Sequence, residues 1–376
     1  MGKNLPFLFV LLALLSLFSA PANAGSRFFK NVGTSFNDTA NWSTSAGGAG
    51  GASIPGSSDI AFFDANSGNC TIDVIINVSG IDSTGYTNTV TQGAFTITTG
   101  SSNFLWVAGI FVGSASAITC TSALLVTGGT FTNTSGTCSV TTNFTSQGTY
   151  SHNNGTVLFS GNQPSNFTSA IFYNLSITKS GASSTITMVT ANAIVNNNLS
   201  IVSASLTFSG LNIEILKDVS FGVSGSGTIK FILNGTGAQS VSGGTCSVNF
   251  EINKASGTLT FTSNITFGRS YQYTTGTVDW QTYKAIITGD TGATITSGTF
   301  YDLEINKNGT SASIAIATAN IIVLNDLTLT LSKTITGAFF FEVGRNLIIN
   351  ATVLSFPKTI MNGTGAQTIS GAVNFP

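Results

Sequence analysis

The segment Asn174-Leu175-Ser176-Ile177 decides the fold, because close variants of it return along the chain. The next two copies are Asn198-Leu199-Ser200-Ile201 and Asp218-Val219-Ser220-Phe221. Three further copies begin at Asp302, Asp326 and Asn346. They are separated from one another by the same numbers of residues as the first three copies, so the whole group of three recurs. Alternating apolar and polar residues are typical of a strand with one buried face. A repeat of roughly 20–24 residues is typical of a solenoid.

A third copy of the repeat lies between the other two and is shorter. The lysine that closes the anchor segment is Lys179, Lys254 or Lys307 in the three copies. The distance in sequence from Lys254 to Lys307 is shorter than the distance from Lys179 to Lys254. The difference is close to the distance between two successive motifs, which is the length expected of a single solenoid repeat. A solenoid tolerates the loss of a whole coil because each repeat contacts only its neighbours. The sequence therefore predicts that the middle copy lacks one coil.

We predict an all-β fold, a single-stranded right-handed parallel β-helix with coils of about 20–24 residues and an N-terminal cap. About fifteen coils, stacked roughly 4.8 Å apart, would form a rod about 70 Å long. The Asn or Asp of each motif should open its strand by bonding to its own backbone. The two apolar residues of each motif should point inward. The residues expected to be buried are Leu175, Ile177, Leu199, Ile201, Val219, Phe221, Leu303, Ile305, Leu327, Leu329, Leu347 and Ile349.

The two ends of the chain carry different signals. Residues 1–24 combine a basic start, an apolar run and the small-residue site Ala22-Asn23-Ala24, which predicts a signal peptide and a secreted or cell-surface protein. Residues 25–65 should cap the first coil with Trp42 as an apolar plug, a flexible linker being the alternative, and residues 66–376 should form the coils. The chain stops where the next anchor strand should begin. We therefore expect a fragment of a longer surface protein, or a last coil packed end-on against a partner.

The composition narrows the class of partner. Charged residues make up 7% of the chain, against roughly 25% in an average soluble domain. This scarcity argues against nucleic acid as a partner, because phosphate binding requires clustered Lys and Arg. No segment after residue 24 is apolar enough over its length to predict a transmembrane helix in the mature chain. The 42% of hydrophobic residues also argues against disorder.

The sequence offers few groups for catalysis. The chain has a single histidine, His152, and it lies in Tyr150-Ser151-His152-Asn153-Asn154-Gly155, which has the composition of a turn. The carboxylates closest in sequence on one strand face are Asp302 and Glu304, which we interpret as a surface pair. No metal-ligand spacing or phosphate-binding glycine motif accompanies them. We therefore expect no enzyme activity, no catalytic or metal site and no cofactor.

Four cysteines, at 70, 120, 138 and 246, enter an oxidising compartment if the chain is exported. Cys120 and Cys138 are separated by nearly one coil and could form a disulfide. However, Cys138 and Cys246 occupy the same position of a Gly-Thr-Cys-Ser-Val segment. A small buried residue is therefore the alternative interpretation, and the sequence leaves both open.

The chain resembles bacterial secreted and cell-surface β-helix repeat proteins, a class that includes autotransporter passenger domains and adhesin-like proteins. The resemblance rests on the NGTGAQ segments at 234–239 and 362–367, on the anchors at 172–179 and 300–307, and on Asn41-Trp42 with Pro55 and Asp59 downstream. It spans nearly the whole mature chain. It implies the architecture, whereas proteins of this class serve as adhesins, stalks, coats and polysaccharide binders.

Three functions remain open from the sequence. The preferred hypothesis is a structural or adhesive surface protein whose Thr/Ser/Asn-rich face meets a surface, a glycan or a neighbouring copy of the chain. The second is a carbohydrate-binding or carbohydrate-active β-helix similar to pectin lyases. The third is ice binding, through outward Thr-x-Thr pairs. These pairs are Thr96 with Thr98, Thr130 with Thr132, Thr258 with Thr260, and Thr328 with Thr330.

Overall fold

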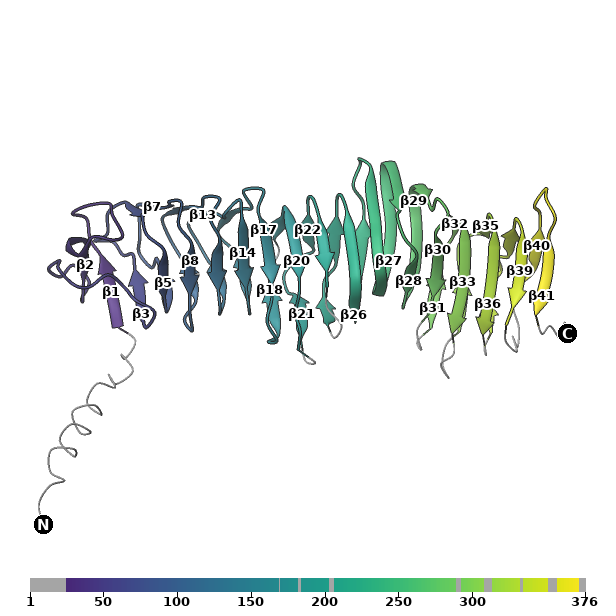
Figure 1. Ribbon diagram of the computed structural model, residues 1–376, viewed down its shortest axis with the longest axis horizontal. Coiled ribbons are helices and arrows are strands. Elements are labelled where there is room, and N and C mark those ends of the chain that lie inside the picture. Colours follow the sequence, from purple (N-terminus) through teal and green to yellow (C-terminus); the bar gives the residue numbers. More distant parts are fainter. Residues whose placement is uncertain are drawn as a thin grey trace, which may run out of the picture.

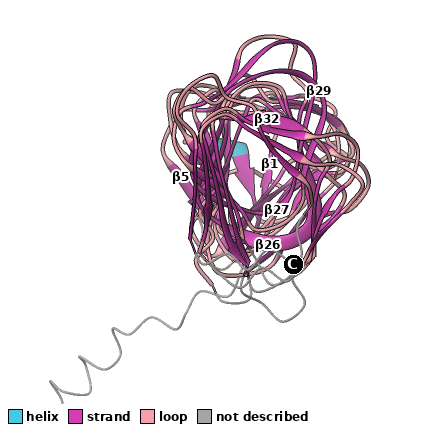
Figure 2. Cartoon of the chain, turned by 90° about the vertical axis from the view of Figure 1, so that its right-hand side faces the viewer, coloured by secondary structure: helices cyan, strands magenta, loops and turns pink. Residues whose placement is uncertain are grey.

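The protein is an elongated parallel β-solenoid of about 14 turns (Figure 1). The computed structural model describes residues 25–371, except 169, 182–183, 203–205, 289–291, 308–312, 332–333 and 351–356. The predicted signal peptide therefore lies outside the described residues, as do the last five residues of the chain. Apart from one short 3₁₀ helix, η1 (Thr39–Asn41), the described elements are strands. Seen along the rod, the strands surround a central axis (Figure 2).

Each turn contributes a strand to three faces, which we call first, second and third in the order in which the chain crosses them. The first face begins with strands that pair in parallel with the strand one turn away. These strands are β5 (Ile76–Val78), β8 (Ile97–Thr99), β11 (Ile118–Cys120), β14 (Thr137–Val140), β17 (Thr156–Phe159), β20 (Asn174–Ile177) and β23 (Leu199–Ile201). Near the C-terminal end the face continues as β32 (Gly298–Phe300), β35 (Ile321–Val323), β38 (Phe341–Val343) and β40 (Thr359–Met361).

The second face runs from the first described strand to the last. In its N-terminal part it contains β1 (Gly25–Phe29), β3 (Asp59–Phe62), β6 (Gly80–Asp82), β9 (Phe104–Trp106), β12 (Leu124–Val126), β15 (Phe144–Ser146), β18 (Ser165–Phe167), β21 (Thr185–Met188) and β24 (Thr207–Gly210). In its C-terminal part it contains β28 (Ile265–Phe267), β30 (Lys284–Ile287), β33 (Asp302–Lys307), β36 (Asp326–Leu331), β39 (Asn346–Ile349) and β41 (Thr368–Gly371). This continuous ladder makes the rod a single body.

The third face starts as a separate five-stranded sheet. Its strands are β4 (Cys70–Ile72), β7 (Thr89–Gln92), β10 (Ile110–Val112), β13 (Thr130–Thr132) and β16 (Thr149–Ser151). The face continues with β19 (Ile171–Phe172), β22 (Ala193–Val195), β25 (Ile213–Ile215), β31 (Ala293–Ile295), β34 (Ile314–Ile316) and β37 (Ile335–Thr336). Three long strands, β26 (Val219–Leu233), β27 (Gln239–Phe261) and β29 (Tyr271–Asp279), pass around corners and serve more than one face.

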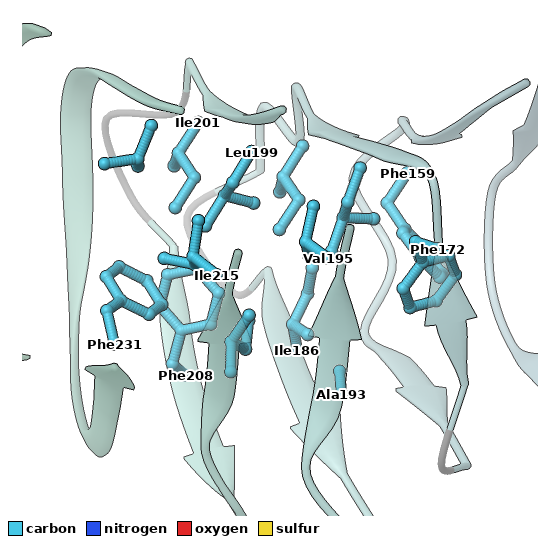
Figure 3. Close-up of a cluster of buried hydrophobic side chains, with 14 of the residues drawn as sticks. Phe159, Phe172, Ile186, Ala193, Val195, Leu199, Ile201, Phe208, Ile215 and Phe231 are labelled. Atoms are coloured by element: carbon cyan, nitrogen blue, oxygen red, sulfur yellow. The ribbon is translucent and has the colours of Figure 1, made fainter. Parts of the chain in front are cut away.

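The core is a column of apolar side chains stacked along the axis. All twelve motif residues expected to be buried are at most 2% exposed, which confirms the predicted inward register. Figure 3 shows Leu199, Ile201 and Ile215 from neighbouring faces pointing into the same interior. Each such side chain contributes roughly 1.5–3 kcal/mol on burial.

The predicted role of the motif Asn or Asp is wrong. The hydrogen bonds that these side chains accept come from the next turn. Asn174, Asp218 and Asp302 accept a backbone N–H there, whereas Asp326 and Asn346 accept from a side chain of the next turn. Asn174 Oδ1 accepts from Asn198 N at 3.2 Å, and Asp302 Oδ1 accepts from Asp326 N at 2.9 Å. The physical reason is the stacking itself: the nearest unpaired donor at a corner lies in the adjacent coil, roughly 4.7–4.9 Å away in a typical ladder, rather than further along the strand. The motif therefore connects coils instead of starting strands.

The shorter middle copy is explained by the pairing. From Leu175 to Phe250 the chain makes three full turns and crosses two further faces, whereas from Phe250 to Leu303 it makes two full turns and crosses two further faces. The copies thus differ by one turn, as the sequence predicts. The three anchors consequently lie on the first, third and second faces. The interval between successive anchors therefore does not correspond to a whole number of turns.

The N-terminal segment differs from the coils. β1 pairs in parallel with β3 but antiparallel with β2 (Trp42–Ser43). Trp42 is fully buried, its Nε1 donates to the Phe36 carbonyl at 2.7 Å, and its ring packs against Phe29 and Phe36. These aromatic rings occupy the end of the core that the first complete coil would otherwise expose to water.

The lysine of each anchor continues the inward alternation. Lys179, Lys254 and Lys307 are all at most 1% exposed. Lys254 Nζ donates to the carbonyl of Gly235 at 2.6 Å, to that of Gly237 at 2.9 Å and to Gln239 Oε1 at 2.6 Å. Burial lowers the pKa of Lys254, and lowers the pKa of Lys179 to about 8. Because Gly235, Gly237 and Gln239 belong to the NGTGAQ segment, the lysine connects that turn to the next coil.

We predict that Lys254→Met lowers the free energy of unfolding by about 2–4 kcal/mol, because it leaves the buried acceptors of the Gly235 turn without a donor. The measurement is chemical denaturation followed by circular dichroism. The exposed Lys217 offers a matched control, since Lys217→Met removes the same charge from the surface. Equal stability of the two variants would contradict a bonding role for the buried lysine.

Candidate binding surfaces

His152 lies at the turn after β16, as the sequence predicts. Its Nδ1 accepts the backbone N–H of Asn154 at 3.0 Å, and its Nε2 lies 3.3 Å from Nδ2 of Asn196. The two residues after it, Asn153 and Asn154, have φ values of 48° and 56°, a conformation that asparagine tolerates better than most residues. The ring therefore holds a left-handed turn, and burial lowers its pKa.

Asp302 and Glu304 lie on the outward side of β33, each with its own partners. Asp302 Oδ1 accepts from Asn325 Nδ2 at 2.8 Å in addition to the backbone of the next turn. Glu304 forms a salt bridge with Lys284 at 3.1 Å. Both carboxylates thus connect coils. Among the described residues, no group of three or more His, Cys, Asp or Glu side chains is placed to hold a metal ion.

The four cysteines are buried free thiols in the structure, which therefore does not contain the predicted Cys120–Cys138 disulfide. A hydrogen bond with Cys120, together with burial, raises the pKa of the Cys138 thiol. The two side chains thus meet inside the core from adjacent turns, and the disulfide stays a prediction for the oxidised protein. Cys138 and Cys246 are both fully buried, which fits the alternative of a small core residue at one repeat position.

The first face carries a straight column of outward side chains at the centre of its strands. The column continues without a gap through nine turns, because each residue is the pairing partner of the next. Its members are Asn77, Thr98, Thr119, Ser139, Leu158, Ser176, Ser200, Ser220 and Ser242. Every residue except Leu158 has a neutral hydroxyl or amide group. We call this array the hydroxyl column.

A shallow depression of about 240 Å³ lies on the hydroxyl column at its C-terminal end. It is lined by Asn198, Ser200, Asp218, Ser220, Ser240 and Ser242, among others. Asp218 Oδ1 accepts both the backbone N–H and the hydroxyl of Ser240, at 2.7 and 2.9 Å. Small side chains on successive rungs leave this space open, and its polar groups are those that bind neutral hydroxylated ligands.

A second depression, of about 250 Å³, lies where the ladder of the first face is interrupted. β32 opens a separate four-stranded sheet instead of pairing with β29. Tyr273, Ser297 and Asn320 are among the residues that line the space. The interruption lies between the second and third anchors, within the shortened copy of the repeat.

The four Thr-x-Thr pairs of the sequence do not form one ladder. Thr98 lies on the first face, Thr130 and Thr132 lie on the third, and Thr328 lies on the second. The pairs are therefore spread around the rod because coils differ in length and corners shift the faces. The hydroxyl column was not predicted from the sequence. The pattern that indicates it is the polar third residue of the repeated four-residue motif, which is Ser176, Ser200 and Ser220 in the first three copies.

Comparison with protein families, with curated proteins and with solved structures finds no match to this chain. In the part of the chain that the structure describes, no helix has the length and apolar character needed to cross a membrane. The resemblance to autotransporter passengers and adhesins therefore rests on the sequence motifs alone.

The pKa of His152 generates a prediction about pH. Since its pKa in the folded protein lies below the ordinary value of 6.5, the unfolded chain takes up the proton first. Stability is therefore full above pH 6.5 and falls as the pH drops from 6.5 toward the lowered pKa. Protonation of Nδ1 would also remove the acceptor of the Asn154 N–H and leave two hydrogen-bond donors facing each other. Because His152 is the only histidine, NMR titration of its ring gives the pKa directly. A pKa above the ordinary value would contradict the prediction. In His152→Gln, the part of the acid destabilisation that comes from protonating the imidazole should be absent.

Proposed function

We propose that the chain is an exported structural or adhesive protein of the cell surface, and that the hydroxyl column is its contact surface. The observation that carries the proposal is the column of paired outward residues over nine turns, all of which except Leu158 have a neutral hydroxyl or amide group. The sequence adds the predicted signal peptide at residues 1–24 and the resemblance to surface β-helix proteins.

The chemistry of the column favours a neutral, hydroxyl-rich partner such as a surface glycan. Ser, Thr and Asn both donate and accept hydrogen bonds, as sugar hydroxyls do. Each such contact is weak, but a rod that repeats one contact on successive rungs gains avidity without any strong single site. A neighbouring copy of the chain is the alternative partner, because the same column could pair with itself.

Adhesion of this kind should depend little on salt, since the column has no ion pairs to screen. We predict that Ser200→Lys together with Ser220→Lys strongly reduces retention of protein-coated beads on glycan-coated surfaces, because two bulky charges then interrupt the column. Raising the ionic strength should leave the retention of the wild type nearly unchanged. The matched control is Thr328→Lys, an outward change on the second face. A reduction as large in that variant would contradict the assignment of the surface.

The second candidate is a carbohydrate-active β-helix, which the depression near Tyr273 favours as a binding site. We propose binding without catalysis, because Asp302 and Glu304 are engaged between coils. Incubation with acidic and neutral polysaccharides should then release no oligosaccharide from wild type, measured as new reducing ends or unsaturated products. Product release that disappears in Asp302→Asn or Glu304→Gln would contradict this.

A further inference from the structure

The five-stranded sheet of the third face presents an ordered outward array. β4, β7, β10, β13 and β16 pair in parallel and in register, so their outward side chains form two straight columns. One column is Thr89, Ile110, Thr130 and Thr149, and the other is Thr71, Thr91, Val112, Thr132 and Ser151. β7 and β13 are labelled on the upper side of the rod in Figure 1. We call these nine residues the threonine array.

The array is uncharged and stiff. Every member except Ser151 is β-branched, and β-branched side chains have restricted χ1 angles. Ordering them against a partner therefore costs little conformational entropy. The two aliphatic members lie at the water-exposed surface, since Ile110 is 43% and Val112 is 37% exposed.

The hydroxyl groups of the array have no hydrogen-bond partner among the described residues. None of the seven hydroxyl side chains, those of Thr71, Thr89, Thr91, Thr130, Thr132, Thr149 and Ser151, forms a hydrogen bond with another described residue. Elsewhere on the rod, threonine hydroxyls bond to the backbone: Thr121 donates to the Gly100 carbonyl at 2.8 Å and Thr134 donates to the Ser116 carbonyl at 2.7 Å. The array therefore leaves a regular set of hydroxyls to the solvent.

A stack of aromatic rings supports the array from inside. Phe111 and Phe131 are parallel, with centroids 4.6 Å apart, and Tyr150 continues the stack at 6.3 Å from Phe131. Tyr150 is fixed in turn by the amide of Asn133, whose Nδ2 donates to its hydroxyl at 3.0 Å. Stacking of this kind is what keeps a sheet of several strands flat. The array is thus backed by stacked aromatic rings on three neighbouring strands.

We propose that the threonine array binds ice. Its groups repeat about 4.8 Å apart between strands and about 6.7 Å apart along each strand, a two-dimensional repeat close to that of water oxygens on the surfaces of hexagonal ice. Methyl groups order the adjacent water, and free hydroxyls anchor ordered water by hydrogen bonds. The absence of charge in the array matches a neutral crystal.

A crystalline polysaccharide fits the array less well. A crystalline polysaccharide presents the apolar faces of its sugar rings, against which aromatic side chains pack with a large contact area, and the nine residues include no aromatic side chain. The depressions near Ser220 and Tyr273 lie on the first face. Ice binding is therefore independent of the adhesive function proposed above.

The test uses the full mature chain, measuring thermal hysteresis and the partition of the protein into a slowly growing ice hemisphere. Wild type should show hysteresis and enter the ice. Thr132→Lys, on the strand β13 beside the central strand β10, should lose most of both signals, and so should Thr91→Lys on β7, the other neighbour of β10. Circular dichroism establishes that each variant is folded. Ser200→Lys, an equivalent charge on the hydroxyl column, should keep both signals.

Three results would overturn the proposal. The first is a folded wild type that shows no hysteresis and is excluded from ice. The second is a folded Thr132→Lys variant as active as Ser200→Lys. The third is a wild type that binds microcrystalline cellulose or chitin through the array but not ice. Bead adhesion above freezing reports separately on the hydroxyl column, so failure of one proposal is distinguishable from failure of the other.

Discussion

Hydrogen bonds between each strand and the strand one turn away are the interaction on which this structure depends. In a parallel ladder the partner of a residue is the residue at the same position of the next coil, so like positions form columns along the rod. The column Ser176, Ser200, Ser220 and the stack of Phe111 on Phe131 are both products of this register. One substitution in an anchor motif therefore changes a single rung of a repeated surface.

The corners are held by contacts that also reach from coil to coil. At a corner the backbone leaves the ladder, and side chains replace the lost hydrogen bonds. Asp302 accepts the backbone N–H of Asp326, and Lys254 donates to the carbonyls of the Gly235 turn. Glycine serves the same end by allowing close approach: Gly243 has φ 83°, and a Cβ there would collide with the Phe221 carbonyl of the previous coil. Some of the few charged residues of this chain thus lie where the backbone needs partners.

The two surfaces discussed above differ in what their hydroxyl groups do. On the first face the hydroxyl column includes serines beside an aspartate that bonds to Ser240, which creates a small polar depression. On the third face every member of the threonine array except Ser151 is β-branched, and the hydroxyl groups of the array form no hydrogen bond with other described residues. Both arise from the same period-two alternation, and the difference lies in side-chain size and branching rather than in the backbone.

The sequence by itself determined the solenoid, the inward residues and the missing coil, because alternation and coil length are local properties that the ladder repeats without change. It also placed His152 in a turn. Only the tertiary structure decided which face each strand occupies. In the coils, paired residues of successive turns are between 18 and 24 residues apart in the sequence, and the repeat does not span a whole number of turns, so later copies lie on other faces of the rod. For this reason the Thr-x-Thr pairs separated, Thr89 and Thr91 joined Thr130 and Thr132 on one sheet, and the motif Asn and Asp residues found their donors in the next coil.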